Sequence, residues 1–205
     1  MVTLRLFQPD DLSDLYAISL ATGHAGGDAS RLYRDPELIG HIYSAPYARL
    51  APHLALVAID EQGPAGFAVG TLDTQAWEDT LERLWWPALR ERYPIPKAPD
   101  GDETPDQRRI AMIHRPEPVP PSIAEAYPAH LHLNLLPRVQ GRGLGSALLR
   151  AWLDLAGPPA VHVGVNTGNS AAVGFWRARD FHGLEGPAGR TIWLGREAGG
   201  RPRNP

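Results

Sequence analysis

The stretch LHLNLLPRVQGRGLGSALLRAWL, from Leu131 to Leu153, is the most informative segment of the chain. An apolar strand pattern meets a proline, and glycines then alternate with other residues at Gly141, Gly143 and Gly145 before an apolar helix pattern begins. An ordinary turn needs one glycine, whereas repeated positions without a side chain indicate that something approaches the backbone closely. Because the first N–H groups of a helix lack partners and carry the positive end of its dipole, the sequence predicts a phosphate-binding turn here.

Two familiar phosphate-binding motifs do not fit this turn. The P-loop requires a lysine followed by Ser or Thr, and GRGLGSA supplies no lysine. The dinucleotide motif requires G-x-G-x-x-G, whereas the spacing here is G-x-G-x-G. The acidic residue that this motif needs ~20 residues further on is also missing from PPAVHVGVNTG. Both classes of nucleotide site are therefore rejected.

Composition excludes several function classes. The 205 residues are 43% hydrophobic and 21% charged, with a formal net charge of −3, so a basic surface for nucleic acid is not expected. No apolar run approaches the ~20 residues that cross a bilayer, and the start MVTLRLFQPDDL lacks the apolar core of a signal peptide. The absence of cysteine excludes disulfides, thiolate metal sites and a cysteine nucleophile. We expect a cytoplasmic protein, monomeric or homodimeric, without nucleic-acid, membrane or metal partners.

The order of strand and helix patterns predicts the fold class. Strand patterns occur at 2–7, 53–60, 65–73, 129–136, 160–165 and 190–195, and the main helix patterns at 9–22, 35–50, 74–93, 106–115, 143–156 and 170–180. Tight turns join two pairs of consecutive strands, which favours a mixed α/β sheet of about seven twisted strands flanked by helices over a regular βαβ array. We expect a single domain over 1–197, with a helical insertion at about 74–128 and a flexible tail at 198–205.

The segment QGRGLG, from Gln140 to Gly145, resembles the Q/R-x-x-G-x-G/A signature of the GCN5-related N-acetyltransferases. The resemblance extends over Leu131–Phe181, because VGVNTGNSAAVGFWRARDF is similar to the next strand and helix of that family. AGFAVGTLDTQAW and the tryptophan-bearing insertion resemble, more narrowly, the acetyltransferase-like domain of O-GlcNAc hydrolases and its free-standing bacterial relatives. A chain filled by this fold has no room for a hydrolase barrel of ~250 residues.

The resemblance implies that acetyl-CoA is the acetyl donor. It would lie in a splayed gap between the strand HLNLL and the strand VHVGV, with its pantetheine paired to the strand backbone and its pyrophosphate on the glycine turn. Arg138 and Arg142 would be the charge partners of the phosphates. The implied cofactor-binding residues are Leu133, Leu135, Leu136, Arg138, Gln140, Gly141, Arg142, Gly143, Leu144, Gly145, Ser146, Asn169, Phe175 and Trp176.

The implied reaction is direct attack of a primary amine on the thioester. It needs an oxyanion donor, for which a backbone N–H at Leu135 or Leu136 is predicted, and a route for the proton that the ammonium loses. The usual tyrosine acid of the family would fall at Trp176, whose indole cannot give up a proton. The hydrolase-associated relatives tend to carry an aspartate where this chain has Asn134. Asp73, at the end of an apolar strand, is therefore the predicted base, with a helix cap as the alternative.

Several polar and aromatic residues leave alternatives open. His130, His132 and Asn134 alternate and so share one strand face, which is predicted to be a partly solvated face or the wall of the acceptor pocket. A metal site is disfavoured because no third ligand is evident. Tyr47 is predicted to be a core residue, with a place in the acceptor groove as the alternative. A core stripe is predicted, with an aromatic acceptor wall as its alternative, for Trp77, Trp85 and Trp86.

The sequence thus predicts an acetyl-CoA-dependent N-acetyltransferase whose acceptor is a small-molecule or protein amine. The alternative is an acetyl-CoA-binding module without catalysis, acting as a sensor or an interaction domain. Trp176 and Asn134 favour that alternative, because neither can supply the acid–base chemistry expected at its position.

Overall fold

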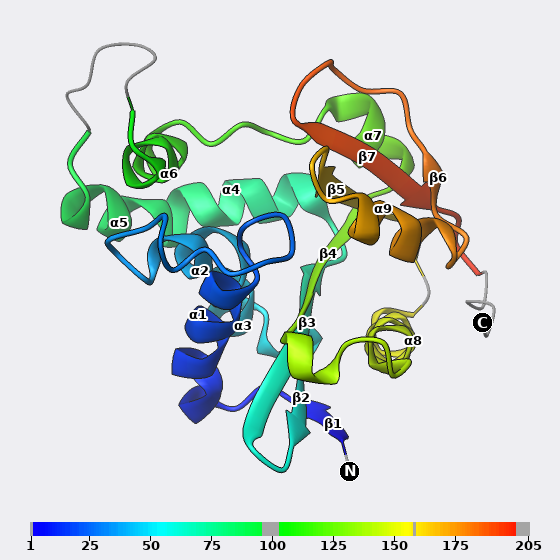
Figure 1. The fold of residues 1–205 in the computed structure, drawn as a ribbon. Coiled ribbons are helices and arrows are strands. Elements are labelled where there is room, and N and C mark those ends of the chain that lie inside the picture. Colours follow the sequence, from blue (N-terminus) through cyan, green and yellow to red (C-terminus); the bar gives the residue numbers. More distant parts are fainter. Residues whose placement is uncertain (1, 96–102, 158, 200–205) are drawn as a thin grey trace.

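A computed structural model describes residues 2–95, 103–157 and 159–199, and its centre is a seven-stranded sheet (Figure 1). The strand order is β1-β2-β3-β4-β5-β7-β6, and only β4 and β5 pair in parallel. The predicted mixed α/β sheet is therefore confirmed. The strands are β1 (Thr3–Leu6), β2 (Ala55–Asp60), β3 (Gly63–Thr71), β4 (Ala129–Leu135), β5 (Val161–Asn166), β6 (His182–Gly183) and β7 (Thr191–Arg196).

Helices occupy most of the connections between strands. They are α1 (Leu12–Ala21), α2 (Leu38–Tyr43), α3 (Ala45–Leu50), α4 (Thr74–Leu84), α5 (Trp86–Arg92), α6 (Pro105–His114), α7 (Pro121–Ala126), α8 (Leu144–Ala156) and α9 (Ser170–Arg177). Within the described part of the chain, none of them combines the length and the apolar character that crossing a bilayer requires.

Two features of the insertion differ from the prediction. The single helix predicted over 74–93 is wrong: α4 ends at Leu84 and α5 begins at Trp86. Pro87 lies in the first turn of α5, where its missing N–H does no harm, whereas in one continuous helix its ring would clash with the preceding turn. The short helix α7, which starts on Pro121, was not predicted, because the proline-rich run before it resembles a loop.

The two faces of the sheet build two apolar cores. Alternate residues of β2 and β3, such as Val57 and Phe67, face α1–α5, while their neighbours Leu56 and Ala68 face α8. Figure 1 shows α1 and α3 on one side of the central strands and α8 on the other. Trp152 of α8 is fully buried, and its Nε1 donates a hydrogen bond to the Leu54 carbonyl (3.0 Å).

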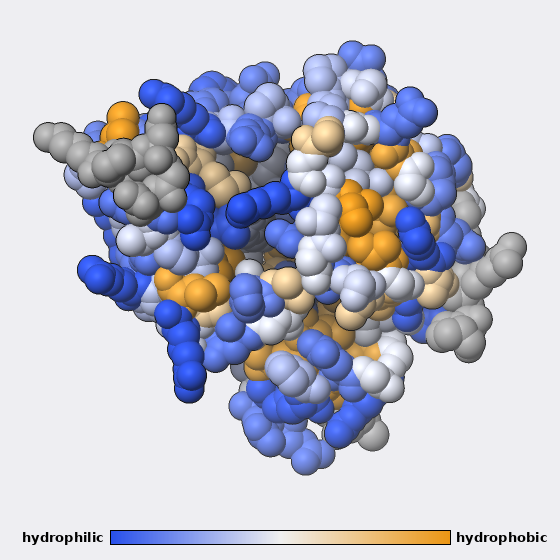
Figure 2. All heavy atoms as spheres, turned by 45° about the horizontal axis from the view of Figure 1, so that its top comes forward, coloured by the Kyte–Doolittle hydropathy of each residue, from blue (hydrophilic) through white to orange (hydrophobic). Residues whose placement is uncertain are grey.

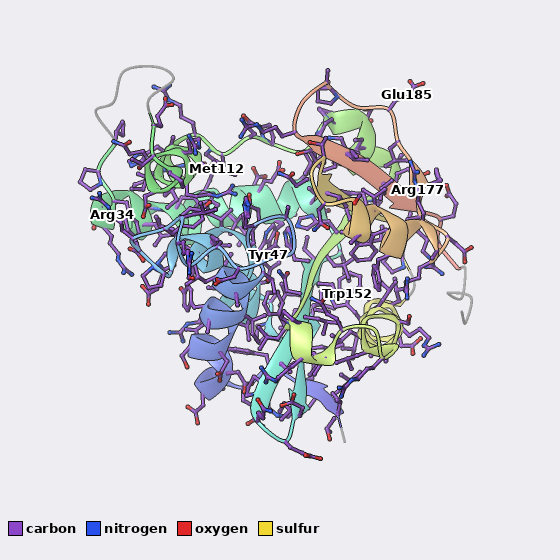
Figure 3. The ribbon with its side chains drawn as sticks, viewed as in Figure 1. Arg34, Tyr47, Met112, Trp152, Arg177 and Glu185 are labelled. Carbon is purple, nitrogen blue, oxygen red and sulfur yellow. The ribbon has the colours of Figure 1, made fainter. Side chains whose placement is uncertain are left out.

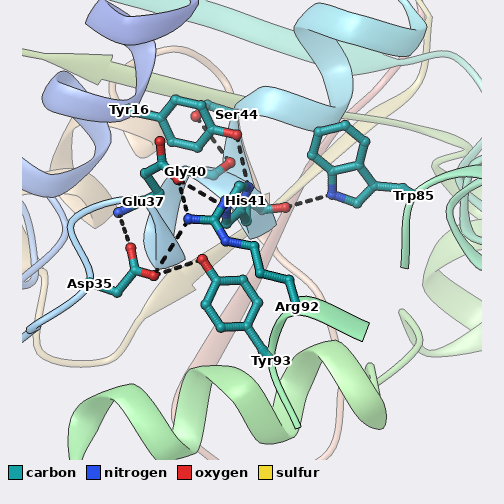
Figure 4. A network of polar contacts seen from close by, with 9 residues as sticks. All are labelled: Tyr16, Asp35, Glu37, Gly40, His41, Ser44, Trp85, Arg92 and Tyr93. Carbon is teal, nitrogen blue, oxygen red and sulfur yellow. Dashed lines mark hydrogen bonds and ion pairs between the residues drawn. The ribbon is translucent and has the colours of Figure 1, made fainter. Parts of the chain in front are cut away.

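Polar contacts attach the helical insertion to α2 (Figure 4). The Nε1 of Trp85 donates to the carbonyl of His41 (2.9 Å), and Arg92 donates to Glu37 (2.7 Å). The His41 ring is buried, and its Nδ1 lies 2.8 Å from the hydroxyl of Tyr16 on α1. The insertion is therefore held against the same helices that cover one face of the sheet.

The parallel contact between β4 and β5 is short. Only Ala129 pairs with Val161 and His130 with His162, after which the two strands separate. The splayed strand pair that the family resemblance implied is therefore present, and it opens toward the glycine turn that follows β4.

Candidate active site

Hydrogen bonds at the two ends of β4 establish which of its backbone groups face the gap. The N–H of Leu136 donates to the Ala65 carbonyl on the β3 side (2.8 Å), whereas the N–H of Ala129 donates on the β5 side (3.2 Å). Because successive residues of a strand direct these groups to opposite edges, the N–H groups of Leu133 and Leu135 face β5. Since β5 has moved away at that level, these N–H groups lie on an open strand edge.

This alternation distinguishes the two predicted oxyanion donors. Leu136 is excluded, because β3 already uses its N–H. Leu135 keeps an N–H on the gap side, and its carbonyl accepts a hydrogen bond from Nε2 of Gln140 (2.7 Å). Gln140 therefore ties the glycine turn to the end of β4.

The three glycines of the turn have different roles. Gly141 (φ 71°) and Gly143 (φ 74°) adopt the left-handed conformation, and a Cβ at either position would meet nothing within 4 Å. They leave the N-terminus of α8 open to a ligand. At Gly145, in contrast, a Cβ would lie 2.7 Å from the Phe175 ring. The close approach there is made by an aromatic side chain of α9, so packing accounts for this glycine.

The predicted charge partners of the phosphates differ in their contacts. Arg138 forms an ion pair with Asp60 (2.8 Å) and also donates to the Pro64 carbonyl (3.2 Å), so its guanidinium is bound to the β2–β3 hairpin. Arg142 is exposed within the glycine turn itself. A role for both in holding phosphate stays a prediction, and the geometry favours Arg142.

A third arginine, which the sequence analysis missed, lies at the start of α8. Nε and Nη2 of Arg179 are 3.0 and 2.6 Å from the hydroxyl oxygen of Ser146, in the first turn of the helix. The guanidinium stacks 3.7 Å from the centre of the Phe175 ring. Burial, and then the charge of Arg150, lower the pKa of Arg179. A cation at the positive end of a helix is unfavourable by itself. A bound anion would be stabilised both by the Arg179 guanidinium and by the N-terminus of α8.

The predicted contacts on α9 have structural roles. The side-chain oxygen of Asn169 caps the helix by accepting the N–H of Ala172 (3.0 Å). Trp176 is 6% exposed and packs against Phe181 with ring centres 4.9 Å apart. It belongs to the core beneath α8 and α9, and cofactor contact by these residues stays a prediction.

The predicted base has a different function in the structure. Asp73 is exposed, and its carboxylate accepts the N–H of Ala76 (3.0 Å) as the N-cap of α4. Thr71 pairs with His130, which places Asp73 at the end of the sheet opposite to the glycine turn. The helix-cap alternative is confirmed, and a base role for Asp73 stays a prediction. Asn134 donates to the hydroxyl of Thr22 (2.6 Å).

Two histidines of β4 and a buried tyrosine form a connected polar cluster. The Tyr47 hydroxyl lies 2.7 Å from Nε2 of His130 and 3.2 Å from Nε2 of His132. Burial lowers the pKa of His130 well below its ordinary value and that of His132 to about 4. Tyr47 itself is buried and stacks on Trp77, with centroids 4.6 Å apart, which confirms a core position for both.

The cluster lies on β4, the central strand of the sheet. Figure 3 shows Tyr47 near the middle of the molecule, close to β4. Figure 2 shows one face of the molecule, which is hollowed near its centre and has mainly hydrophilic side chains around the hollow.

No protein-family model matches the chain, whereas solved structures are similar to it over most of its length. SsHAT, whose crystal structure has been solved, is 38% identical in sequence to this chain. The two structures match with a TM-score of 0.87, over 95% of this chain and 97% of SsHAT. The PaiA N-acetyltransferase of Thermoplasma acidophilum in complex with coenzyme A gives a TM-score of 0.56 at 14% identity, over 96% of this chain and 99% of that one. Structural similarity at that identity is evidence of a shared fold.

The curated relatives are longer proteins. Protein O-GlcNAcase of Rattus norvegicus is 22% identical over 155 residues, which are 74% of this chain and 16% of that protein. The chain thus corresponds to about a sixth of its length. The identity with SsHAT over nearly the whole chain, with the fold shared with PaiA, shows that the chain belongs to the GCN5-related N-acetyltransferase family.

Proposed function

We propose that the protein transfers the acetyl group of acetyl-CoA to a primary amine. The observation that carries this proposal is the open edge of β4, where the N–H groups of Leu133 and Leu135 face a gap that leads to the glycine turn. The amide groups of a pantetheine arm can pair with such an edge as an added strand does. In support, family members of this fold have been crystallised with coenzyme A (PaiA) and with the cofactor acetyl-CoA (yncA of Salmonella typhimurium).

The position of the reacting carbonyl follows from this placement. The pyrophosphate would bind at Gly141–Gly143 on the N-terminus of α8, with Arg142 and Arg179 as its cationic neighbours. The arm would then extend along β4 toward the point where β4 and β5 pair. A strand N–H on that edge would stabilise the oxyanion, and the thiolate leaves readily because the pKa of a thiol is only ~8.5.

The acceptor is proposed to be a primary amine, on a small molecule or on a protein. Tyr43 and His132, whose rings meet edge to face with centres 5.5 Å apart, would form part of its binding wall. An aromatic wall can hold the cationic form of an amine before it is deprotonated.

Calorimetric titration with acetyl-CoA, coenzyme A and NADH tests the proposed donor. Gly143→Asp and Gly143→Asn form a matched pair, because both side chains tolerate the left-handed conformation and only one carries a charge. We expect saturable binding of acetyl-CoA and not of NADH. Binding should be about tenfold or more weaker in Gly143→Asp than in Gly143→Asn, since the carboxylate would repel the pyrophosphate. Equal affinities of the two variants would contradict a phosphate site in this turn.

A second candidate function is an acetyl-CoA-binding module without catalysis. The observation that favours it is Trp176, which places a buried indole where the family resemblance implies a phenol. Release of coenzyme A in the presence of amines distinguishes the two functions. Because the chain contains no cysteine, a thiol reagent reports only the released coenzyme. Binding without release would favour the module.

A further inference from the structure

The hydrogen bonds around the histidine cluster can be satisfied in only one direction, which Thr74 determines. Its hydroxyl donates to the Pro128 carbonyl (2.8 Å), which can only accept. The hydroxyl oxygen also lies 2.7 Å from Nδ1 of His130. Since its one proton is already used, Thr74 must accept there. His130 therefore carries its proton on Nδ1.

The proton on Nδ1 of His130 in turn determines the proton positions of Tyr47 and His132. Burial lowers the pKa of His130, so this ring is neutral and its Nε2 is an acceptor. Tyr47 must donate its hydroxyl proton to that nitrogen (2.7 Å). The Tyr47 oxygen is then left to accept from Nε2–H of His132 (3.2 Å). His132 thus has its proton on Nε2 and a lone pair on Nδ1, an atom that takes part in no hydrogen bond among the described residues.

We propose that His132 is the general base of the acetyl transfer, with Nδ1 as the proton acceptor and with Tyr47, His130 and Thr74 as positioning residues. The inference rests on the proposed function. His132 immediately precedes Leu133, whose N–H faces the cofactor gap, so the imidazole and a thioester in that gap approach the same point of β4. The His132 residue is half-buried, whereas His130 is buried, so it is the histidine of this pair that a ligand can reach.

An acceptor R–NH3⁺ must lose two protons to become the amide R–NH–CO–CH3. Nδ1 of His132 takes one and later releases it to water. The amine nitrogen bonds to the acetyl carbon, the carbon–sulfur bond breaks, and the thiolate leaves with the bonding electron pair. The second proton converts the thiolate to a thiol. The net products are the amide, coenzyme A and one proton.

The surroundings of His132 keep its ring neutral and ready to accept a proton. The groups that face it are Tyr43 of α2, Tyr47 of α3, His130 of β4 and His162 of β5, with Arg109 of α6 bound to the hydroxyl of Tyr43. Burial, and next the neighbouring His162, lower the pKa of His132 to about 4, so the lone pair is free at neutral pH. Each group in the chain from Tyr47 to Thr74 directs an acceptor atom toward His132, so Nε2–H keeps its hydrogen-bond partner while Nδ1 carries the proton.

Three variants separate the base from the alternatives. His132→Gln keeps an N–H that can reach Tyr47 but has no basic lone pair. Tyr47→Phe breaks the chain that orients His132. His53→Gln is the matched control, because it makes the same change at an exposed histidine outside the cluster. Coenzyme A release is measured at saturating acetyl-CoA with benzylamine, a lysine peptide and hydroxylamine, and acetyl-CoA affinity is measured by calorimetry.

We expect His132→Gln to lower kcat with benzylamine about 10²-fold or more, with unchanged acetyl-CoA affinity and with loss of the acidic limb of the pH profile. The defect should be smaller with hydroxylamine, which is already neutral at pH 7. Tyr47→Phe should lower kcat about tenfold, because it removes one hydrogen bond from His132. It should also shift the acidic limb of the pH profile. His53→Gln should keep full activity.

A spectroscopic measurement tests the orientation directly. The ¹⁵N shifts of the imidazole rings should show Nε2–H at His132 and Nδ1–H at His130 in the unmodified protein, and mixed protonation of His132 in Tyr47→Phe. The reverse assignment would overturn the positioning chain. Full activity of His132→Gln, or loss of acetyl-CoA binding in that variant, would overturn the base while the proposed function stands. If the unmodified protein acetylated none of the three amines, both the base assignment and the proposed function would be overturned.

Discussion

At Gly70, near the C-terminal end of β3, the backbones of β3 and β4 and a side chain of α8 meet at one position without a side chain. A Cβ there would lie 2.3 Å from the carbonyl oxygen of His130, 2.6 Å from the Trp152 ring and 3.0 Å from the Cα of Leu131. Two of these neighbours are backbone atoms of the next strand, which cannot rotate away. Glycine is therefore required here by contact between β3 and β4 and not by an unusual backbone angle.

We expect Gly70→Ala to lower the free energy of unfolding by about 2–3 kcal/mol, because the strands must separate to admit the methyl group. Gly174→Ala is the control, since a Cβ at Gly174 meets nothing within 4 Å and alanine favours the helix α9. That variant should be as stable as the unmodified protein or slightly more so. Urea unfolding measures both, and a Gly70→Ala protein as stable as the control would contradict this account.

At the scale of elements, the sequence predicted what local patterns encode. The strand over 129–136 and the glycine turn with its helix follow from apolar periodicity and helix-end chemistry, and the structure confirms them. The break of the insertion helix before Pro87 was missed because the amphipathic pattern continues across it. The histidine chain was beyond prediction, since Tyr47 and Thr74 are 83 and 56 residues from His130 and no periodicity connects them.

The position of α8, which carries the proposed phosphate site, depends on Trp152. Trp152→Phe would remove the donor to the buried Leu54 carbonyl and leave a small cavity, so we expect a loss of about 2–4 kcal/mol in the free energy of unfolding. Trp85→Phe removes a similar hydrogen bond from a half-buried tryptophan and should cost only about 1 kcal/mol. Thermal unfolding compares them, and equal losses would show that burial of the indole N–H is unimportant.

For the molecule as a whole, buried imidazoles link stability to pH. Burial lowers the pKa of His41, His130, His132 and His162 below the ordinary value. Between that value, about 6.5, and their folded values, the unfolded chain binds more protons than the folded one. The contribution of these neutral rings to the free energy of unfolding is therefore complete above about pH 6.5. It is lost as the pH falls from there toward 4.

We therefore expect the free energy of unfolding to fall by about 3 kcal/mol or more between pH 7 and pH 4.5, since one pKa unit corresponds to about 1.4 kcal/mol. His132→Gln should reduce the slope by up to one proton, whereas His53→Gln, which changes an exposed histidine outside the cluster, should keep it. The ion pair with Arg5 lowers the pKa of Asp11, so its contribution is lost only below about pH 3.8, in a separate window. Urea titrations across pH 4.5–7.5 measure the slope. A stability that stays level or rises on acidification would mean that these rings are charged in the folded protein, and the directional chain to His132 could not exist.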